Sequence, residues 1–278
     1  MSDTNAAPVV CLHSSAASGR QWRRLVADGG PAWPWHTPDL YGHGSRPDWP
    51  ELMPNRLSVE ANGVLAGLPF AADRGFHLVG HSYGGAVALQ VALQQPDRVL
   101  SLTLYEPAAF GVLPVTEPRE PALREISEAA ARLDATLDRG DEFGAARSFC
   151  AYWQGRDVWP EMDAAQQLRV AEAMPTVRRH FEALFAAPWR SGLLGQLLMP
   201  VQLICGTATR ASARRVAQNL ALQLPRARLQ MLEGAGHMAP ITDGARVNAL
   251  LLESLARMPC VPVVRLRQRG AEAGAAFR

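Results

Sequence analysis

Short apolar runs alternate with segments of helical spacing along most of the chain. The apolar runs are candidate strands, and they cover Val9–Leu12, Trp35–Leu40, Phe76–Val79, Leu100–Tyr105, Val201–Cys205 and Arg228–Leu232. The candidate helices lie between most of these runs, at Gly19–Ala27, Ser58–Ala66, Gly85–Gln94, Ala211–Leu222 and Ala245–Ala256. Strands that alternate with helices predict βαβ units joined by right-handed crossovers. We therefore expect an α/β fold built on a mostly parallel sheet.

One long segment, residues 113–195, interrupts this alternation. It has helical spacing over Ala122–Leu137 and Ala164–Ala173 and no convincing strand pattern. Ordinary crossovers are much shorter than this segment. We therefore predict a helical cap over the carboxyl edge of the sheet, where open α/β sheets bind ligands. The alternative is that the segment is simply part of the main fold.

The predicted cap divides the chain into parts. Residues 1–112 and 196–258 form the expected core, and residues 259–278 form a tail rich in Ala and Gly with four arginines. A flexible terminus is the simpler interpretation of the tail, and an interaction arm is the alternative.

Composition excludes several classes of function. The chain has 278 residues, 48% of them hydrophobic and 19% charged, which is ordinary for a soluble globular protein. A formal net charge of +2, with no basic stripe that carries interleaved aromatics, argues against nucleic acid as a partner. No run reaches transmembrane length and the first residues lack signal-peptide features, so we expect a cytoplasmic protein without a membrane partner. It would be a monomer or a homodimer.

The cysteines give no sign of a metal or disulfide framework. They are dispersed, with no C-x-x-C pair, at Cys11, Cys150, Cys205 and Cys260. We therefore expect no zinc site and no disulfide scaffold.

The most informative motif is G-x-S-x-G at residues 80–84, with Ser82 at its centre. An apolar run precedes it and a helix-forming segment follows it. A strand that turns directly into a helix lifts the corner residue clear of the sheet, and glycines at Gly80 and Gly84 leave room for the turn. This context predicts a nucleophile elbow, with a purely structural turn as the alternative.

A serine hydroxyl needs a base, and His237 is the first candidate. It lies in a glycine-flanked loop just after the last predicted strand, where its imidazole can reach the carboxyl edge of the sheet. His81 is adjacent to Ser82, but neighbouring side chains diverge, so buried support is its simpler role. The remaining histidines are assigned to loops, strands or the predicted cap: His13, His36, His43, His77 and His180.

An acyl-transfer site also needs backbone N–H groups that stabilise an oxyanion. Tyr83, directly after the candidate nucleophile, is one expected donor. The other should come from the loop after the first strand, with Ser15 as first choice and Ser14 as second. This serine-rich turn could also cap the helix that begins near Gly19.

At this point the chain, over about residues 8–256, resembles the α/β-hydrolase superfamily. The matching stretches are Leu12-His13-Ser14-Ser15 followed by Trp22, Asp39-Leu-Tyr-Gly-His-Gly, Gly80-His-Ser-Tyr-Gly-Gly and Gly234-Ala-Gly-His237. Within the superfamily, the predicted cap and the elbow look most like the cofactor-independent esterase, haloperoxidase-like and carbon–carbon-bond hydrolase branches. The resemblance implies a Ser-His-acid triad and a cap after the sixth of the family's eight strands. The first two family strands are missing here, so we expect about six strands in the family order 4-3-5-6-7-8.

The chain departs from the family pattern at the triad acid. The resemblance places the acid at position 209, which is Thr209, and Ser14 replaces the glycine of the oxyanion loop. A threonine cannot balance an imidazolium charge. Some branches carry the acid at the end of the preceding strand, which here is Glu106. Competing carboxylates are Asp39, Glu233 and Asp243, and the absence of any functional acid is the last alternative.

The sequence therefore predicts a serine hydrolase that cleaves a carboxylic ester or related small acyl compound without metal or organic cofactor. Aromatic residues of the cap could line the acyl pocket or merely pack the cap on the core: Trp153, Trp159, Phe181, Leu184 and Phe185. A carbon–carbon bond hydrolase or lyase is one alternative, with Arg178, Arg179 and Arg190 as candidate carboxylate binders. A binding protein that kept the fold and lost turnover is the other.

Overall fold

A single parallel sheet organises the chain. The computed structural model describes residues 6–113, 120–187, 189 and 191–257. Within them the sheet order is β2-β1-β3-β4-β5-β6, with every neighbouring pair parallel. The strands are β1 Val9–Leu12, β2 Trp35–His36, β3 Phe76–His81, β4 Val99–Tyr105, β5 Val201–Gly206 and β6 Ala227–Leu232. This confirms the predicted α/β fold and its strand order.

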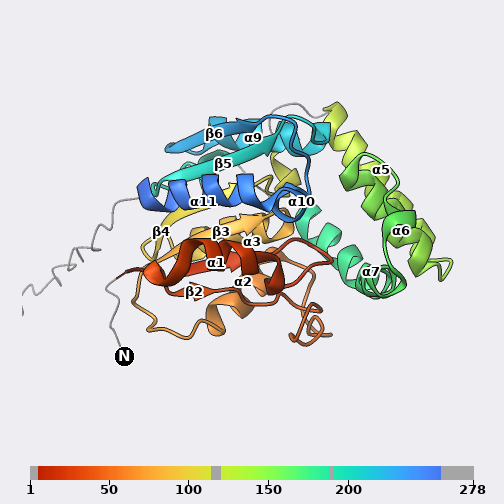
Figure 1. Cartoon of the computed structure of the whole chain (residues 1–278), viewed down its shortest axis with the longest axis horizontal. Helices are drawn as coiled ribbons and strands as arrows, with labels where there is room; N and C mark the ends of the chain where they lie inside the picture. Colours follow the sequence, from red (N-terminus) through yellow and green to blue (C-terminus); the bar gives the residue numbers. More distant parts are fainter. Residues whose placement is uncertain (1–5, 114–119, 188, 190, 258–278) are drawn as a thin grey trace, which may run out of the picture.

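Helices cover both faces of the sheet (Figure 1). Alternate residues of each strand point to opposite faces, so Val9 and Cys11 pack with α1 and α11 while Val10 and Leu12 pack with α2, α3 and α9. The helix bounds are α1 Arg23–Gly29, α2 Leu57–Ala66, α3 Tyr83–Gln94, α9 Ala211–Gln223, α10 Ala239–Thr242 and α11 Gly244–Arg257. Short 3₁₀ turns are η1 Gly19–Trp22, η2 Gly30–Ala32, η3 Phe110–Val112 and η4 Trp159–Glu161.

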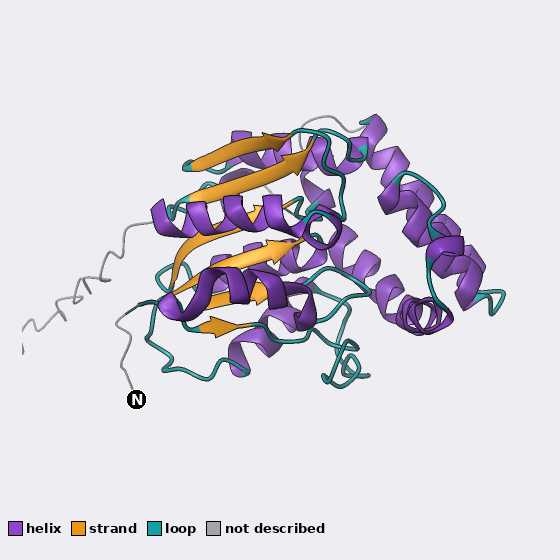
Figure 2. Cartoon of the chain, in the orientation of Figure 1, coloured by secondary structure: helices purple, strands orange, loops and turns teal. Residues whose placement is uncertain are grey.

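A helical insertion between β4 and β5 stands over the carboxyl ends of the strands (Figure 2). We call it the cap; its helices are α5 Pro121–Leu137, α6 Glu142–Gln154, α7 Ala164–Phe185 and α8 Ser191–Leu194. Both α5 and α7 contact core elements, α9 and α3 respectively. The cap therefore rests on the helices that follow β3 and β5.

Three sequence expectations need adjustment. The second strand was expected over Trp35–Leu40 but ends at His36, because Pro38 lacks an N–H donor for the pairing with β1. Helix α7 continues past its expected end at Ala173 to Phe185, although Pro175 lies inside it. Helix α6 lies within the segment expected to be helical, but no range was predicted for it. The predicted tail at 259–278 lies outside the described residues.

Candidate active site

The turn from β3 into α3 holds Ser82 in a rare backbone conformation. Its φ and ψ are 53° and −118°, and its N–H donates to the Tyr105 carbonyl at 3.1 Å. The turn depends on glycine, since a Cβ on Gly84 would lie 2.4 Å from the carbonyl oxygens of Leu12 and His13. A serine in this strained position, held by packing on all sides, is typical of a nucleophile elbow.

Ser82, His237 and Glu106 form one chain of hydrogen bonds. The Ser82 Oγ lies 3.0 Å from His237 Nε2, and His237 Nδ1 lies 2.7 Å from Glu106 Oε2. Because a carboxylate only accepts, Nδ1–H donates to Glu106 and Nε2 is left to accept from the serine hydroxyl. All three side chains are buried, with Ser82 6% exposed and Glu106 fully enclosed. This arrangement can deprotonate a serine and then stabilise the resulting imidazolium.

Glu106 is fixed by donors from the end of β5 and from the turn that follows it. The Gly206 N–H donates to Oε1 at 2.8 Å, and the Thr209 hydroxyl donates to Oε2 at 2.6 Å. Thr209 stands where the family resemblance places the acid. Its hydroxyl instead donates to the carboxylate of Glu106, the residue directly after β4. Two of the three competing acids are engaged elsewhere: Asp39 accepts from Gly19 and Ser45, and Asp243 pairs with Arg246. The third, Glu233, is exposed.

Every non-glycine residue with positive φ in the described ranges lies at this site. They are Ala16 at 55°, Ser82 at 53° and Glu106 at 42°, in the loop after β1, the elbow and the turn after β4. Such conformations carry a cost of about 1–3 kcal/mol each and cluster at functional sites. The strain therefore marks the three segments expected to supply the oxyanion donor, the nucleophile and the acid.

Three contacts hold the loop that carries His237. The Tyr105 hydroxyl donates to the Gly236 carbonyl at 2.8 Å, and His81 Nε2–H donates to the His237 carbonyl at 2.9 Å. The indole of Trp153, from α6, stacks on the His237 ring with centroids 4.0 Å apart. His81 is therefore buried support, as expected. Burial, and next the nearby His237, hold its pKa well below the usual value, so the ring is neutral.

Gln21 connects the loop after β1 to this histidine. Its Oε1 accepts from both the N–H and the hydroxyl of Ser14 at 3.1 Å, and its Nε2 donates to His81 Nδ1 at 3.2 Å. Sequence reasoning missed Gln21. The only signal was its place beside Trp22 in the matching stretch, which does not distinguish it from any polar helix residue.

Hydrogen bonds in this loop show which of the candidate oxyanion donors have a free N–H group among the described residues. Ser14, the second choice, is not available because its N–H is bonded to Gln21. The N–H of Ala16 donates to His43 Nε2 at 2.9 Å. Within the described residues the N–H groups of Ser15 and Tyr83 have no acceptor, and Tyr83 is the first residue of α3, where helical N–H groups lack internal partners. The geometry favours Ser15 and Tyr83.

Of the aromatic pocket candidates, Trp153 contacts the triad directly. Phe181 and Phe185 of α7 pack with Phe110, at centroid distances of 6.4 Å and 5.8 Å. Trp159 meets Phe143 edge-on within the cap. The guanidinium of Arg178 already pairs with Asp134 and Asp138, which leaves it poorly suited to a substrate carboxylate. Arg179 is half-buried beside it, and Arg190 lies outside the described residues.

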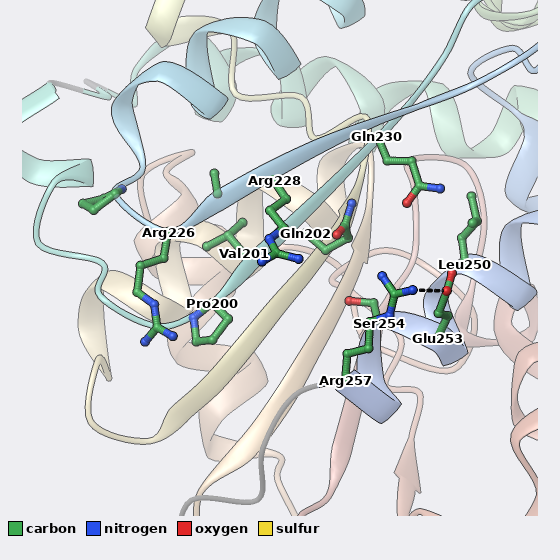
Figure 3. A pocket seen from close by; sticks show the side chains of 12 residues that line it. Pro200, Val201, Gln202, Arg226, Arg228, Gln230, Leu250, Glu253, Ser254 and Arg257 are labelled. Carbon is green, nitrogen blue, oxygen red and sulfur yellow. Dashed lines mark hydrogen bonds and ion pairs between the residues drawn. The ribbon is translucent and has the colours of Figure 1, made fainter.

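A cavity of about 440 Å³ lies elsewhere, at the amino ends of β5 and β6 (Figure 3). Pro200, Arg226, Arg228 and Arg257 are among its lining residues. Ser82 follows the carboxyl end of β3, so this cavity does not serve the triad. Among the described residues, no group of three or more His, Cys, Asp and Glu side chains could hold a metal ion. No helix in the described ranges has the length and apolarity to cross a membrane.

A parallel sheet with a serine elbow, a histidine after the last strand and a helical cap defines an α/β-hydrolase. The family model described as "Alpha/beta hydrolase family" matches residues 9–250. Lipase LipV of Mycobacterium tuberculosis is 30% identical over 90% of this chain and 93% of its own. The pimeloyl-[acyl-carrier protein] methyl ester esterase of Neisseria meningitidis serogroup B is 29% identical over 87% of this chain and 90% of its own. The chain belongs to the alpha/beta hydrolase family.

Solved structures agree on the fold. The enol-lactonase from Burkholderia xenovorans LB400 has a TM-score of 0.72 and 18% identity, over 91% of this chain and 93% of its own. The esterase RhEst1 from Rhodococcus sp. ECU1013 has a TM-score of 0.69 and 22% identity, over 92% of this chain and 93% of its own. At such identities the likeness shows the shared architecture.

Proposed function

We propose that this protein is a serine hydrolase that cleaves a carboxylic ester or a related acyl compound through an acyl-enzyme on Ser82. The observation that carries the proposal is the hydrogen-bond chain from Ser82 Oγ through His237 to Glu106. The named activities of the relatives support it, since they include a lipase and a methyl ester esterase. The substrate would be a small molecule, and we place the protein in the cytoplasm.

The proposed reaction begins with proton transfer from Ser82 to His237 Nε2 as the serine oxygen attacks the substrate carbonyl. The oxyanion accepts hydrogen bonds from the N–H groups of Tyr83 and Ser15. Glu106 stabilises the imidazolium, and the face of Trp153 adds cation–π attraction. His237 then protonates the leaving alcohol, and the acyl group stays on Ser82. Water, activated by the same histidine, releases the acid and restores the enzyme.

The two alternative functions are weaker. The carbon–carbon bond hydrolase or lyase has less support, because Arg178, one of its three candidate carboxylate binders, is paired with Asp134 and Asp138. The non-catalytic binding protein rested on Thr209 in place of an acid. That argument is weakened because Thr209 donates to Glu106, which bonds to the histidine.

Labelling with a fluorophosphonate probe tests the proposal. We expect one adduct per chain on Ser82, lost in Ser82→Ala and retained in Ser101→Ala, a matched variant of a buried serine on β4. Esters, thioesters and lactones are then screened for turnover. A parent protein that neither labels at Ser82 nor hydrolyses any of them would contradict the proposal.

A further inference from the structure

A histidine of the cap contacts both residues proposed to supply the oxyanion donors. His180, on α7, is 1% exposed. Its Nδ1 and the Ser15 hydroxyl share a hydrogen bond of 2.8 Å. Its ring stacks on the Tyr83 ring with centroids 3.5 Å apart and planes at 7°. Sequence reasoning assigned His180 to core or surface packing, because nothing local connects it to residues so far away in the chain.

The same ring also contacts a second histidine, which fixes the loop. His43 stacks on His180 with centroids 5.1 Å apart. Its Nδ1–H donates to the Tyr41 carbonyl, and its Nε2 accepts from the N–H of Ala16. Ala16 carries the positive φ of the loop after β1. Ser15 is therefore clamped on both sides, by its own hydroxyl on His180 and by the next peptide on His43.

His180 occupies this position at a cost in stability. Its Nε2 is buried and has no hydrogen-bond partner in the described part of the chain. Leaving such a group unsatisfied costs about 1–3 kcal/mol. Burial, followed by the nearby His43 and His13, holds the pKa of His180 well below its usual value, so the ring is neutral. A phenyl ring would stack on Tyr83 without this cost, so the hydrogen bond to Ser15 is what the imidazole adds.

We propose that His180 is a positioning residue that sets the oxyanion hole from the cap. Through Ser15 it holds one backbone N–H in place, and through the stacked ring it holds the side chain of Tyr83, the residue that supplies the other. With α7 packed on the core, the N–H groups of Ser15 and Tyr83 would then both be held in place. If the cap moved away, the positions of these two donors would no longer be fixed. The inference rests on the proposed serine hydrolase function.

Two substitutions remove the hydrogen bond from opposite ends. Ser15→Ala keeps the backbone N–H and deletes the hydroxyl, and His180→Phe keeps a ring on Tyr83. Deleting an oxyanion donor outright costs about 10²–10³ in kcat, and a misplaced donor should cost less, so we expect about a tenfold fall in kcat. KM should change little, because the interaction matters in the transition state. The double variant should be no slower than either single variant.

A second buried histidine supplies the matched control. His77, on β3, shares a 2.8 Å hydrogen bond with the Ser101 hydroxyl through Nδ1, and its Nε2 is also unpartnered among the described residues. His77→Phe and Ser101→Ala therefore make the same chemical change away from the triad. We expect similar shifts in melting temperature and unchanged kcat for this pair.

The experiment compares kcat, KM, melting temperature and the affinity for a boronic acid that forms a tetrahedral anion on Ser82. A parallel loss of kcat and boronate affinity in Ser15→Ala and His180→Phe, without that loss in the control pair, supports the inference. If Ser15→Ala keeps the parental kcat and boronate affinity, or if only KM or the melting temperature changes, the inference about His180 is overturned. The serine hydrolase proposal would still stand. Ser15→Ala decides the matter if His180→Phe does not fold. A parent that fails to label at Ser82 overturns both.

Discussion

Replacing Glu106 with glutamine should disable the enzyme by reversing the histidine tautomer. One carboxylate oxygen accepts from the Gly206 N–H, and the other accepts from Thr209 and His237. An amide nitrogen on the Gly206 side would face a fixed donor at 2.8 Å. The amide should therefore turn its nitrogen toward Thr209 and His237, both of which can become acceptors. His237 then carries its proton on Nε2 and cannot accept from Ser82.

The size of this effect follows from the role of the third member. Loss of the correct tautomer in a serine triad lowers kcat by about 10⁴-fold, so we expect Glu106→Gln to lower kcat by about 10³–10⁴-fold. The assay is steady-state hydrolysis of an activated ester, with melting temperature as a check on folding. Thr209→Val is the control, since it deletes one donor to the carboxylate and leaves the acid, so its loss should stay below about tenfold. A loss below tenfold in Glu106→Gln itself would remove Glu106 from the triad.

Three further predictions follow from particular contacts. Trp153→Leu removes the indole stacked on His237, and a lost cation–π attraction of about 0.5–2 kcal/mol predicts a fall in kcat/KM of about 2–30-fold in ester hydrolysis; an unchanged rate would exclude this role. Gly84→Ala places a methyl group against backbone carbonyls at 2.4 Å, so urea unfolding should show a loss of about 1–3 kcal/mol or more, and near-parental stability would contradict the packing. Burial raises the pKa of Glu60 from 4.5 to about 7, so its neutral form favours folding; this contribution is full below pH 4.5 and is lost as the pH rises through 7. The free energy of unfolding of the parent, measured in urea, should therefore fall by roughly 3 kcal/mol between pH 4.5 and pH 7. Glu60→Gln should remove this pH dependence, and a pH dependence that persists in Glu60→Gln would refute the assignment.

The sheet and the elbow could be predicted because local residues determine them. Apolar runs identified every strand, and the glycines around Ser82 are required by contacts that any tight strand-to-helix turn makes. The position of Glu106 could be inferred because β4 neighbours β3 and parallel strands end at one edge. The prediction needed only strand order.

The contacts between distant segments could not be predicted. Gln21 and His180 act through partners on other elements, His81 and Ser15, and their own neighbours in sequence carry no matching signal. The range of helix α6, within the segment expected to be helical, could not be predicted because it contains Gly144 and several aromatic residues, which are weak helix formers. Tertiary packing stabilises it, and it brings Trp153 onto His237.

The most direct test of the central claim is to trap the acyl-enzyme. The reaction with an activated ester is quenched in acid during steady-state turnover, and the acyl group is located by peptide mass spectrometry. Ser82 should carry the acyl mass, and the modified peptide should disappear in Ser82→Ala together with turnover. Turnover that continues in Ser82→Ala, or an acyl group found on a different residue, would contradict a hydrolase that works through Ser82, His237 and Glu106.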